Sequence, residues 1–217
     1  MPLLSRAFVA TAIIVAVLGW VASQGPAFAT RVVVENGPVE VVQGLLLATV
    51  MVLVARRAAR LVALGRSAAS EVVLFFGFSI LLAGELEAWQ VVFGRTLTTR
   101  HVLRMSPIKF GFAMVTLALI VTLMVAVVVY TLRHFRELLA WALAALRSDW
   151  GWVLLTGLLI FACTELFERK LNSIQRAIFP KTFLEEGLEL LANSFFVLAL
   201  RERDRVDPVG RTPRDPA

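Results

Sequence analysis

The sequence predicts an all-α integral membrane protein, because its apolar residues are abundant and gathered into long blocks. Of 217 residues, 59% are hydrophobic and only 18% are charged, whereas an average soluble domain has about 45–50% and about 25%. A transmembrane helix needs about 20 mostly apolar residues in succession. Blocks of roughly this length recur along the chain, separated by short segments with charges and prolines. We therefore expect a single transmembrane helical domain over residues 1–200.

The blocks predict a bundle of six spans. In order, they cover about 7–23, 39–55, 67–92, 111–132, 150–168 and 183–200. The fourth span is the clearest because it contains no charge, while the third and sixth carry glutamates within their apolar stretch. Pro26, Pro38, Pro107 and Pro180 all fall between spans, where a missing backbone donor costs little.

The first span has a second interpretation as a signal peptide. Arg6, the apolar run Ala7–Ala22 and the small residues of Ala27-Phe28-Ala29 match the three parts of such a peptide. Its cleavage would leave five spans and the same remaining topology. A retained helix is favoured by the length of the run and by the spans that follow, and both interpretations stay open.

The positions of the basic residues predict the orientation. With the N-terminus inside, the inner segments contain more Lys and Arg than the outer ones, which places both termini in the cytoplasm of a multi-pass protein of the cell membrane. The net charge of +6 is expected to attract anionic lipid headgroups rather than nucleic acid. No groove of alternating basic and aromatic residues accompanies it, so nucleic acid is not an expected partner.

Two segments outside the spans each predict a particular structure. Leu138–Leu146, between Glu137 and Arg147, is an apolar stretch after the fourth span. It predicts either a helix lying on the inner membrane interface or a continuation of that span. Residues 201–217 alternate in charge and contain three prolines, which predicts a disordered cytoplasmic tail.

Acidic residues are concentrated at one level of the predicted bundle. Of the twelve acids before the tail, nine lie beside or inside the outer ends of the spans. These are Glu35, Glu40, Glu85, Glu87, Glu165, Glu168, Glu185, Glu186 and Glu189. A carboxylate at the centre of a membrane helix costs roughly 2.5–3.5 kcal/mol on insertion scales, so such residues are functional candidates by default.

The strongest candidates for binding an ion or relaying a proton are the polar residues expected to lie deepest. They are Glu85, Glu87, Glu165, Glu189 and Asn193. Glu185, Glu189 and Asn193 follow at intervals of four, so they form one polar stripe down an apolar helix. Glu85 and Glu87 differ by about 200° in rotation and point to opposite helix faces. A second group comprises Glu40, Gln43, Glu168, Glu185, His101 and Arg104.

Two other roles are open to these glutamates. Paired with the outer cations, they would form a structural network that only shapes the outer surface. The cations in question are Arg95, Arg100, Arg104, Lys109, Arg169 and Lys170. Metal binding has little support, because Glu165-x-x-Glu168 occurs without any Glu-x-x-His. No cofactor is predicted, and the single cysteine, Cys163, excludes an internal disulfide.

The sequence therefore leaves three functions open. The first is a small transporter or channel-like protein for a cation or proton. Of equal weight is a non-catalytic subunit or scaffold, which would dock a membrane-protein partner or a second copy through its charged outer surface. A membrane-embedded enzyme is less favoured. No Ser–His or Cys–His pair lies at the acidic level, and Leu190 replaces the arginine of the Glu-Glu-x-x-x-Arg signature of one intramembrane protease class.

Overall fold

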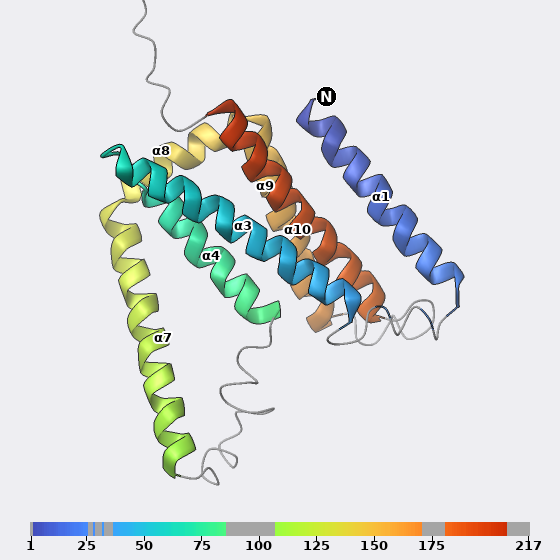
Figure 1. Cartoon of the computed structure of the whole chain (residues 1–217), viewed down its shortest axis with the longest axis horizontal. Helices are drawn as coiled ribbons and strands as arrows, with labels where there is room; N and C mark the ends of the chain where they lie inside the picture. The colour runs from blue at the N-terminus through green and yellow to red at the C-terminus, as the bar shows by residue number, and fades with distance from the viewer. Residues whose placement is uncertain are drawn as a thin grey trace, which may run out of the picture.

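The computed structural model describes residues 2–25, 28, 32, 37–85, 107–170 and 181–207, without the side chains of 84–85, 107–113, 117, 165–170 and 181–184. Within these residues all the regular secondary structure is helical, as predicted (Figure 1). The helices are α1 (Leu3–Ser23), α3 (Pro38–Ala63), α4 (Ala69–Glu85), α7 (Pro107–Arg133), α8 (Phe135–Leu146), α9 (Asp149–Lys170) and α10 (Lys181–Val206).

Local sequence signals explain where α3 ends and α4 begins. Gly65 has a φ of +67°, a left-handed conformation that glycine adopts without strain. Its N–H donates to Val62 and the N–H of Arg66 donates to Leu61, so the last carbonyls of α3 are satisfied in a Schellman motif. The Ser67 hydroxyl then accepts from the N–H of Ala69 at 3.3 Å. This turn reverses the chain and places α4 against α3.

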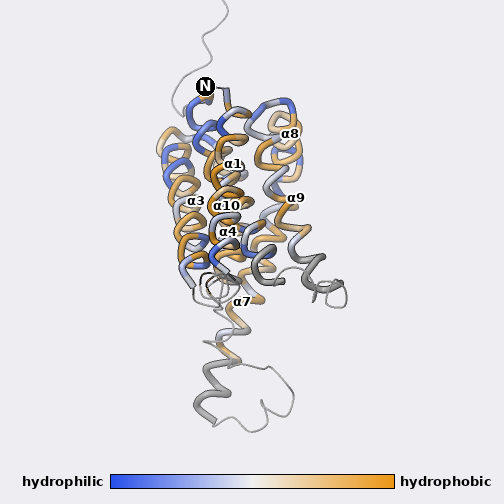
Figure 2. The backbone as a smooth tube through the Cα atoms, turned by 90° about the vertical axis from the view of Figure 1, so that its right-hand side faces the viewer, coloured by the Kyte–Doolittle hydropathy of each residue, from blue (hydrophilic) through white to orange (hydrophobic). Residues whose placement is uncertain are grey.

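The bundle is organised around α10, which packs against α9, α3 and α1 (Figure 1). The core between these helices contains Leu47, Val50 and Val54 of α3, Phe78 of α4, Val153 and Leu154 of α9, and Phe195, Phe196, Ala199 and Leu200 of α10. Figure 2 shows that hydrophobic residues occupy much of the middle of these helices, with hydrophilic residues toward the helix ends. The edge-to-face contact of Phe78 and Phe196, 5.1 Å between ring centroids, joins α4 to α10 at mid-height.

Glycines allow the closest helix approaches. A Cβ at Gly187 would lie 2.7 Å from Leu18 of α1, and one at Gly157 would lie 2.8 Å from the Phe196 ring. Small residues at such crossings let membrane helices pack closely without a hydrophobic driving force. These two contacts hold α1 and α9 against α10.

The segment from α7 to α9 turns sharply. α7 diverges from the bundle in Figure 1, and none of its apolar window is buried in the protein. α8 follows as a separate short helix and is bent by 100° relative to α9. The stretch 138–146 was predicted to form either an interfacial helix or a continuation of the fourth span. It belongs to a separate helix, α8, which begins at Phe135 after α7 ends at Arg133.

The described helices give fewer clear membrane spans than the sequence predicts. Three are long and apolar enough to cross a membrane: Leu3–Ser23, Pro38–Ala63 and Met114–Arg133. A fourth is obtained if α8 and α9 count as one bent span. The expected six spans are thus not confirmed. The apolar part of α4 described by the structure, Ala69–Ala83, is short, and α10 carries charges at both ends.

The predicted tail requires a correction at its start. α10 continues to Val206, so disorder from Arg201 onward is wrong for residues 201–206. Alternating charge predicts a solvated segment, but Arg203 is buried in this last part of α10. Residues 208–217 lie outside the described part of the chain.

The α8–α9 corner should not tolerate a side chain at Gly151. An added Cβ would clash with the backbone carbonyl oxygen of Ala145, which cannot move aside as the end of a flexible side chain can. We expect Gly151→Ala to destabilise the protein by about 1–3 kcal/mol, as overpacking does. Unfolding in detergent measures this. The control is Gly77→Ala in α4, where the same Cβ meets nothing within 4 Å. It should stabilise by about 0.5–1 kcal/mol, and equal behaviour of the two variants would contradict the corner geometry.

Candidate functional site

The buried face of α3 has a polar residue on either side of its apolar middle, and Val39 continues the face beyond Gln43. Gln43, Leu47, Val50, Val54 and Arg57 are buried, and their alternating spacing of four and three residues is that of a helix-packing seam. The ends of this seam lie about 20 Å apart, at about 1.5 Å per residue. Each end meets polar groups of α10, so two separate polar sites are built on the same pair of helices.

The first site, the Gln43 layer, comprises Gln43, Glu186 and Asn193. The Gln43 side chain is fully buried, and its Nε2 donates to the backbone oxygen of Glu186 at 2.9 Å. Asn193 lies seven residues further along α10, on the same helix face and about 10 Å deeper. Asn193 is also fully buried, beside Ala192 and Phe196 with no exposed surface. Polar groups therefore continue inward from the helix start into an apolar interior.

The Gln43 layer has hydrogen-bonding capacity that the described residues do not use. Among them, no partner exists for Oε1 of Gln43, Oε2 of Glu186, or either polar side-chain atom of Asn193. A buried polar group left in this state costs about 1–3 kcal/mol, so each such exception asks for a physical explanation. Amide and carboxylate oxygens are the ligands that hard cations prefer. The layer is chemically suited to a small cation or to a shared proton.

The predicted site residues fall into three groups. Gln43 and Asn193 are buried, and Glu40, Glu185 and Glu189 are half-buried near the same end of the bundle. Because α10 is helical throughout, Glu185, Glu189 and Asn193 do share a face, as predicted. Glu85 ends α4, and Glu165 and Glu168 lie in the last turns of α9, where their side chains are not described. Glu87, His101 and Arg104 lie outside the described residues, as do Arg95 and Arg100 of the alternative structural network.

The convergence of these glutamates remains a prediction. What the structure brings together is Gln43 with Glu186, a residue counted among the nine acids but not selected as a candidate. The candidates were the residues expected to lie deepest, and in the sixth span these were taken from the stripe of Glu185, Glu189 and Asn193, to which Glu186 does not belong. The sequence feature that could have identified Glu186 lies on another helix. Gln43 is a polar residue near the start of the buried face of α3, and a buried amide requires a polar partner.

The second site, the Arg57 network, is a cluster of ion pairs that sequence analysis missed. It comprises Arg57, Glu71, Arg203, Asp204 and Asp207. Arg57 lies 3.3 Å from Glu71 (Nε–Oε1) and 3.1 Å from Asp204 (Nη1–Oδ1), and it also pairs with the Asp207 carboxylate. Its Nη1 donates to the Asp207 backbone oxygen at 2.7 Å. Nη2 of Arg203 donates to Oε2 of Glu71 at 2.9 Å.

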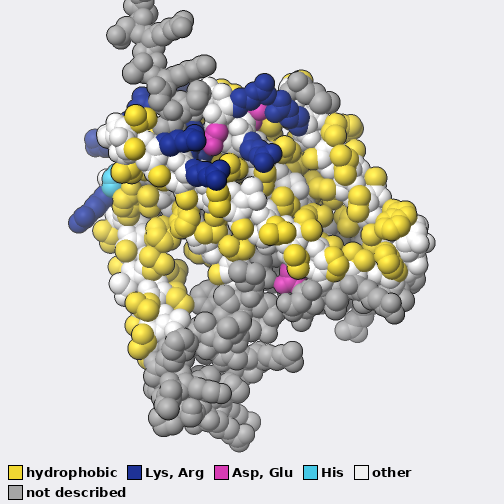
Figure 3. Space-filling model, viewed as in Figure 1, with side chains coloured by type: hydrophobic (Ala, Val, Ile, Leu, Met, Phe, Trp, Pro, Cys, Tyr) yellow, Lys and Arg dark blue, Asp and Glu magenta, His cyan; other side chains and the backbone are white. Residues whose placement is uncertain are grey.

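One further contact joins α9 to the Arg57 network, and a separate ion pair joins α1 to the same end of α10. The Arg203 guanidinium lies 5.8 Å from the centroid of the Trp150 ring in α9, within cation–π range. Next to it, Arg6 of α1 pairs with Glu202 at 3.0 Å. Figure 3 shows that arginines gather at this end of the molecule, with few on the apolar flank below.

The Arg57 network is a structural clamp because its central charges cannot reach water. Glu71 and Arg203 are each 1% exposed. Charges this deeply buried are tolerated only when paired, since removing one partner leaves the other uncompensated. A sequence signal existed: Arg57 lies on the α3 seam, three residues after Val54, and Glu71 begins an otherwise apolar helix. Assigning Arg203 to a disordered tail hid the third member.

Other sites find no support in the described residues. No group of three or more His, Cys, Asp or Glu there is placed to hold a metal ion, and Cys163 is an exposed free thiol. Comparison with protein-family models, with curated proteins and with solved structures found no match to this chain.

Glu71→Gln should destabilise the bundle strongly. It leaves the guanidinium groups of Arg57 and Arg203 buried without their shared carboxylate, and breaking a buried pair costs about 3–5 kcal/mol. Equilibrium unfolding in detergent measures the loss. The control is Arg205→Gln, whose side chain is 66% exposed and pairs with Glu202 at 3.9 Å. Surface changes of this kind stay within about 0.5 kcal/mol. A Glu71→Gln effect as small as the control's would show that Glu71 does not hold the helices together.

Proposed function

We propose that this chain is a six-span membrane protein that binds a small cation or a proton at the Gln43 layer and moves it across the bilayer. The observation that carries the proposal is Asn193: its side chain is fully buried and neither polar atom has a partner among the described residues. Evolution toward stability alone would favour an apolar residue there, because replacing an unpaired buried polar group removes its desolvation penalty.

The neighbouring residues support a route into the Gln43 layer. Glu40 and Glu185 are half-buried at the starts of α3 and α10, and Glu186 follows directly. An ion approaching this end would meet carboxylates first, then the amides of Gln43 and Asn193. Secondary transporters commonly bind substrates between helices near the middle of the membrane. The depth of Asn193 within α10 fits such a site.

The Arg57 network supplies the opposite barrier in this proposal. Between it and Gln43 lie Leu47, Val50 and Val54 of α3, in the same core cluster as Phe196 and Leu200. An ion cannot cross this apolar seam unless α3 and α10 separate. The buried ion pairs hold the two helices together at the basic end, so we expect alternating access to require their rearrangement.

A second candidate function is a membrane subunit, and one observation favours it. α7 is apolar from Met114 to Leu132, and the residues that the structure describes bury none of its apolar window. Such a helix is suited to contact lipid or another membrane protein. The pairing of Glu71 and Asp204 with arginines also agrees with a structural role for those acids. The two functions are separated by whether Asn193 influences ion movement.

Asn193→Leu should abolish ion flux while leaving the protein at least as stable. The reason is that leucine has a similar volume and no polar atoms to desolvate. Proteoliposomes with imposed H⁺, Na⁺ or K⁺ gradients measure flux, and unfolding in detergent measures stability. The control is Ser194→Ala, which removes a hydroxyl that donates to Leu190 within its own helix. It should retain flux. Wild-type flux in Asn193→Leu would refute transport through this layer, and a less stable variant would assign Asn193 a structural role.

The six-span topology places the two ends of the bundle on opposite membrane sides, with the basic end in the cytoplasm. In a Cys163→Ser background, Gln24→Cys reports on the end of α1 and Ser67→Cys on the α3–α4 turn; both positions are exposed. A membrane-impermeant maleimide applied to intact cells should label the first, and the second only after permeabilisation. The reverse pattern would invert the orientation, and labelling of both in intact cells would contradict the threading.

A further inference from the structure

α8 presents three different faces along its twelve residues. On the first face, Ala145 is buried, and the Trp141 ring lies 6.0 Å from that of Trp150 between centroids. This face fixes α8 against the start of α9. The sharp bend at the α8–α9 corner prevents α8 from joining the bundle as a parallel member, so its other two faces are left outside.

The second face is an exposed apolar stripe. Phe135, Leu139, Leu143 and Leu146 are 56%, 47%, 50% and 42% exposed. Their spacing of four, four and three residues places them within about 80° of one another around the helix. A continuous apolar stripe on a short helix with a basic neighbouring face is typical of a helix lying in the membrane interface.

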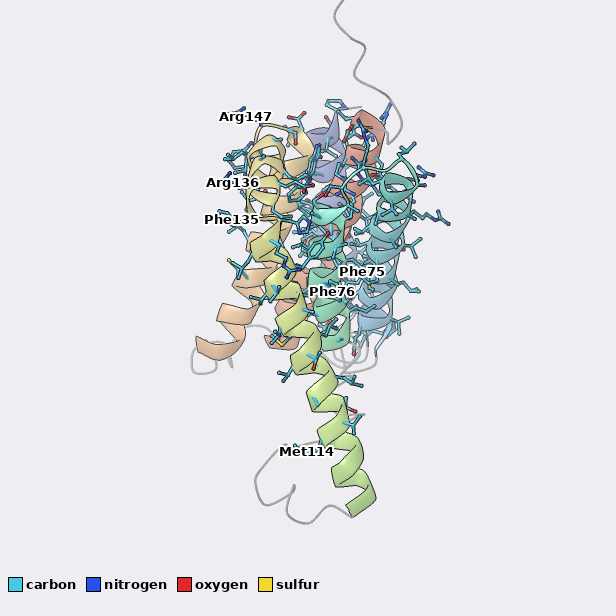
Figure 4. All side chains as sticks on the ribbon, turned by 90° about the vertical axis from the view of Figure 1, so that its left-hand side faces the viewer. Phe75, Phe76, Met114, Phe135, Arg136 and Arg147 are labelled. Carbon is cyan, nitrogen blue, oxygen red and sulfur yellow. The ribbon has the colours of Figure 1, made fainter. Side chains whose placement is uncertain are left out.

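The third face, adjoining the stripe, carries Arg136, and Arg147 follows as the C-cap residue of the helix. They are eleven residues apart, which is close to three full turns, so they point in nearly the same direction about 16 Å apart along the axis. Both are exposed, and neither forms an ion pair with any residue that the structure describes. Figure 4 shows Phe135, Arg136 and Arg147 together on the outer side of the molecule.

We propose that α8 is a binding site for the headgroups of anionic phospholipids. With the stripe submerged among the acyl chains, Arg136 and Arg147 lie at the level of the lipid phosphates. Each guanidinium can donate two parallel hydrogen bonds to one phosphate. Arg133, exposed at the end of α7 and three residues before Arg136, adds a third cation near the start of α8. The partner is a lipid rather than a soluble anion, because the charges adjoin an apolar surface that only acyl chains match.

This site is independent of the Gln43 layer, which lies toward the other end of the bundle. α8 is packed on α9 through Trp150, the same ring that faces Arg203. Lipid bound to α8 therefore stabilises the corner next to the Arg57 network. We expect anionic lipid to raise the thermal stability of the protein.

Native mass spectrometry of the detergent-purified full chain tests this site with phosphatidylglycerol and phosphatidylcholine as probes. We expect tighter binding of phosphatidylglycerol, weakened about tenfold or more in the double variant Arg136→Gln/Arg147→Gln. The matched control is Arg56→Gln/Arg60→Gln, which removes the same charge from exposed positions of α3 at the same end. It should bind phosphatidylglycerol within about twofold of wild type, and without lipid all three proteins should unfold at similar temperatures.

Three results would overturn the proposal. Equal losses in the two double variants would show only a general attraction of a basic surface. Equal binding of phosphatidylcholine would remove the role of lipid charge. Equally tight binding of glycerol phosphate, which has the charged group without acyl chains, would show that the apolar stripe contributes nothing and that the ligand is a soluble phosphate.

Discussion

The fold depends on the need to pair charges that are buried between helices. Glu71 is 1% exposed and lies at the first turn of α4, so it requires cations from its neighbours, which Arg57 and Arg203 supply. These contacts fix how far α3, α4 and α10 are shifted along their axes relative to one another. Helices are stiff, so fixing one end fixes the other: the register that joins Arg57 to Asp204 also brings Gln43 to Glu186, about 20 Å away.

The two polar sites on the α3–α10 seam differ in a way that suggests different roles. In the Arg57 network, each buried carboxylate oxygen of Glu71 meets an arginine nitrogen, as stability requires. Among the described residues, Nε of Arg57 and Nε and Nη1 of Arg203 have no hydrogen-bond partner, but both guanidinium groups still pair with carboxylates. In the Gln43 layer, neither polar side-chain atom of Asn193 has any partner among the described residues. Natural proteins give up stability in this way mainly where a site must accept something. The same two helices thus combine a clamp with a site whose polar groups have spare capacity.

The comparison between prediction and structure separates local from long-range information. The described helices and the α8 segment were predictable, because a run of apolar residues and its flanking prolines act within a few turns of chain. The number of spans was less predictable, since α4 and α10 combine apolar and charged residues. Whether the charges of such a helix can be buried depends on the residues that pack against it. Arg201 to Val206 were predicted to be disordered for the same reason. Their charges look solvated in sequence, but Arg203 is buried against Glu71 and Trp150.

The amino-acid sequence by itself determined that this chain forms apolar helices and, to within a few residues, where most of them begin. Those properties follow from composition and from spacing along single helices. Only the tertiary structure decided which charges meet: Arg57 with Glu71 across a turn, Glu71 with Arg203 across more than half of the chain, and Gln43 with Glu186. The physical reason is that burial and pairing depend on neighbours in space, and residues so distant in sequence become neighbours only when the helices pack.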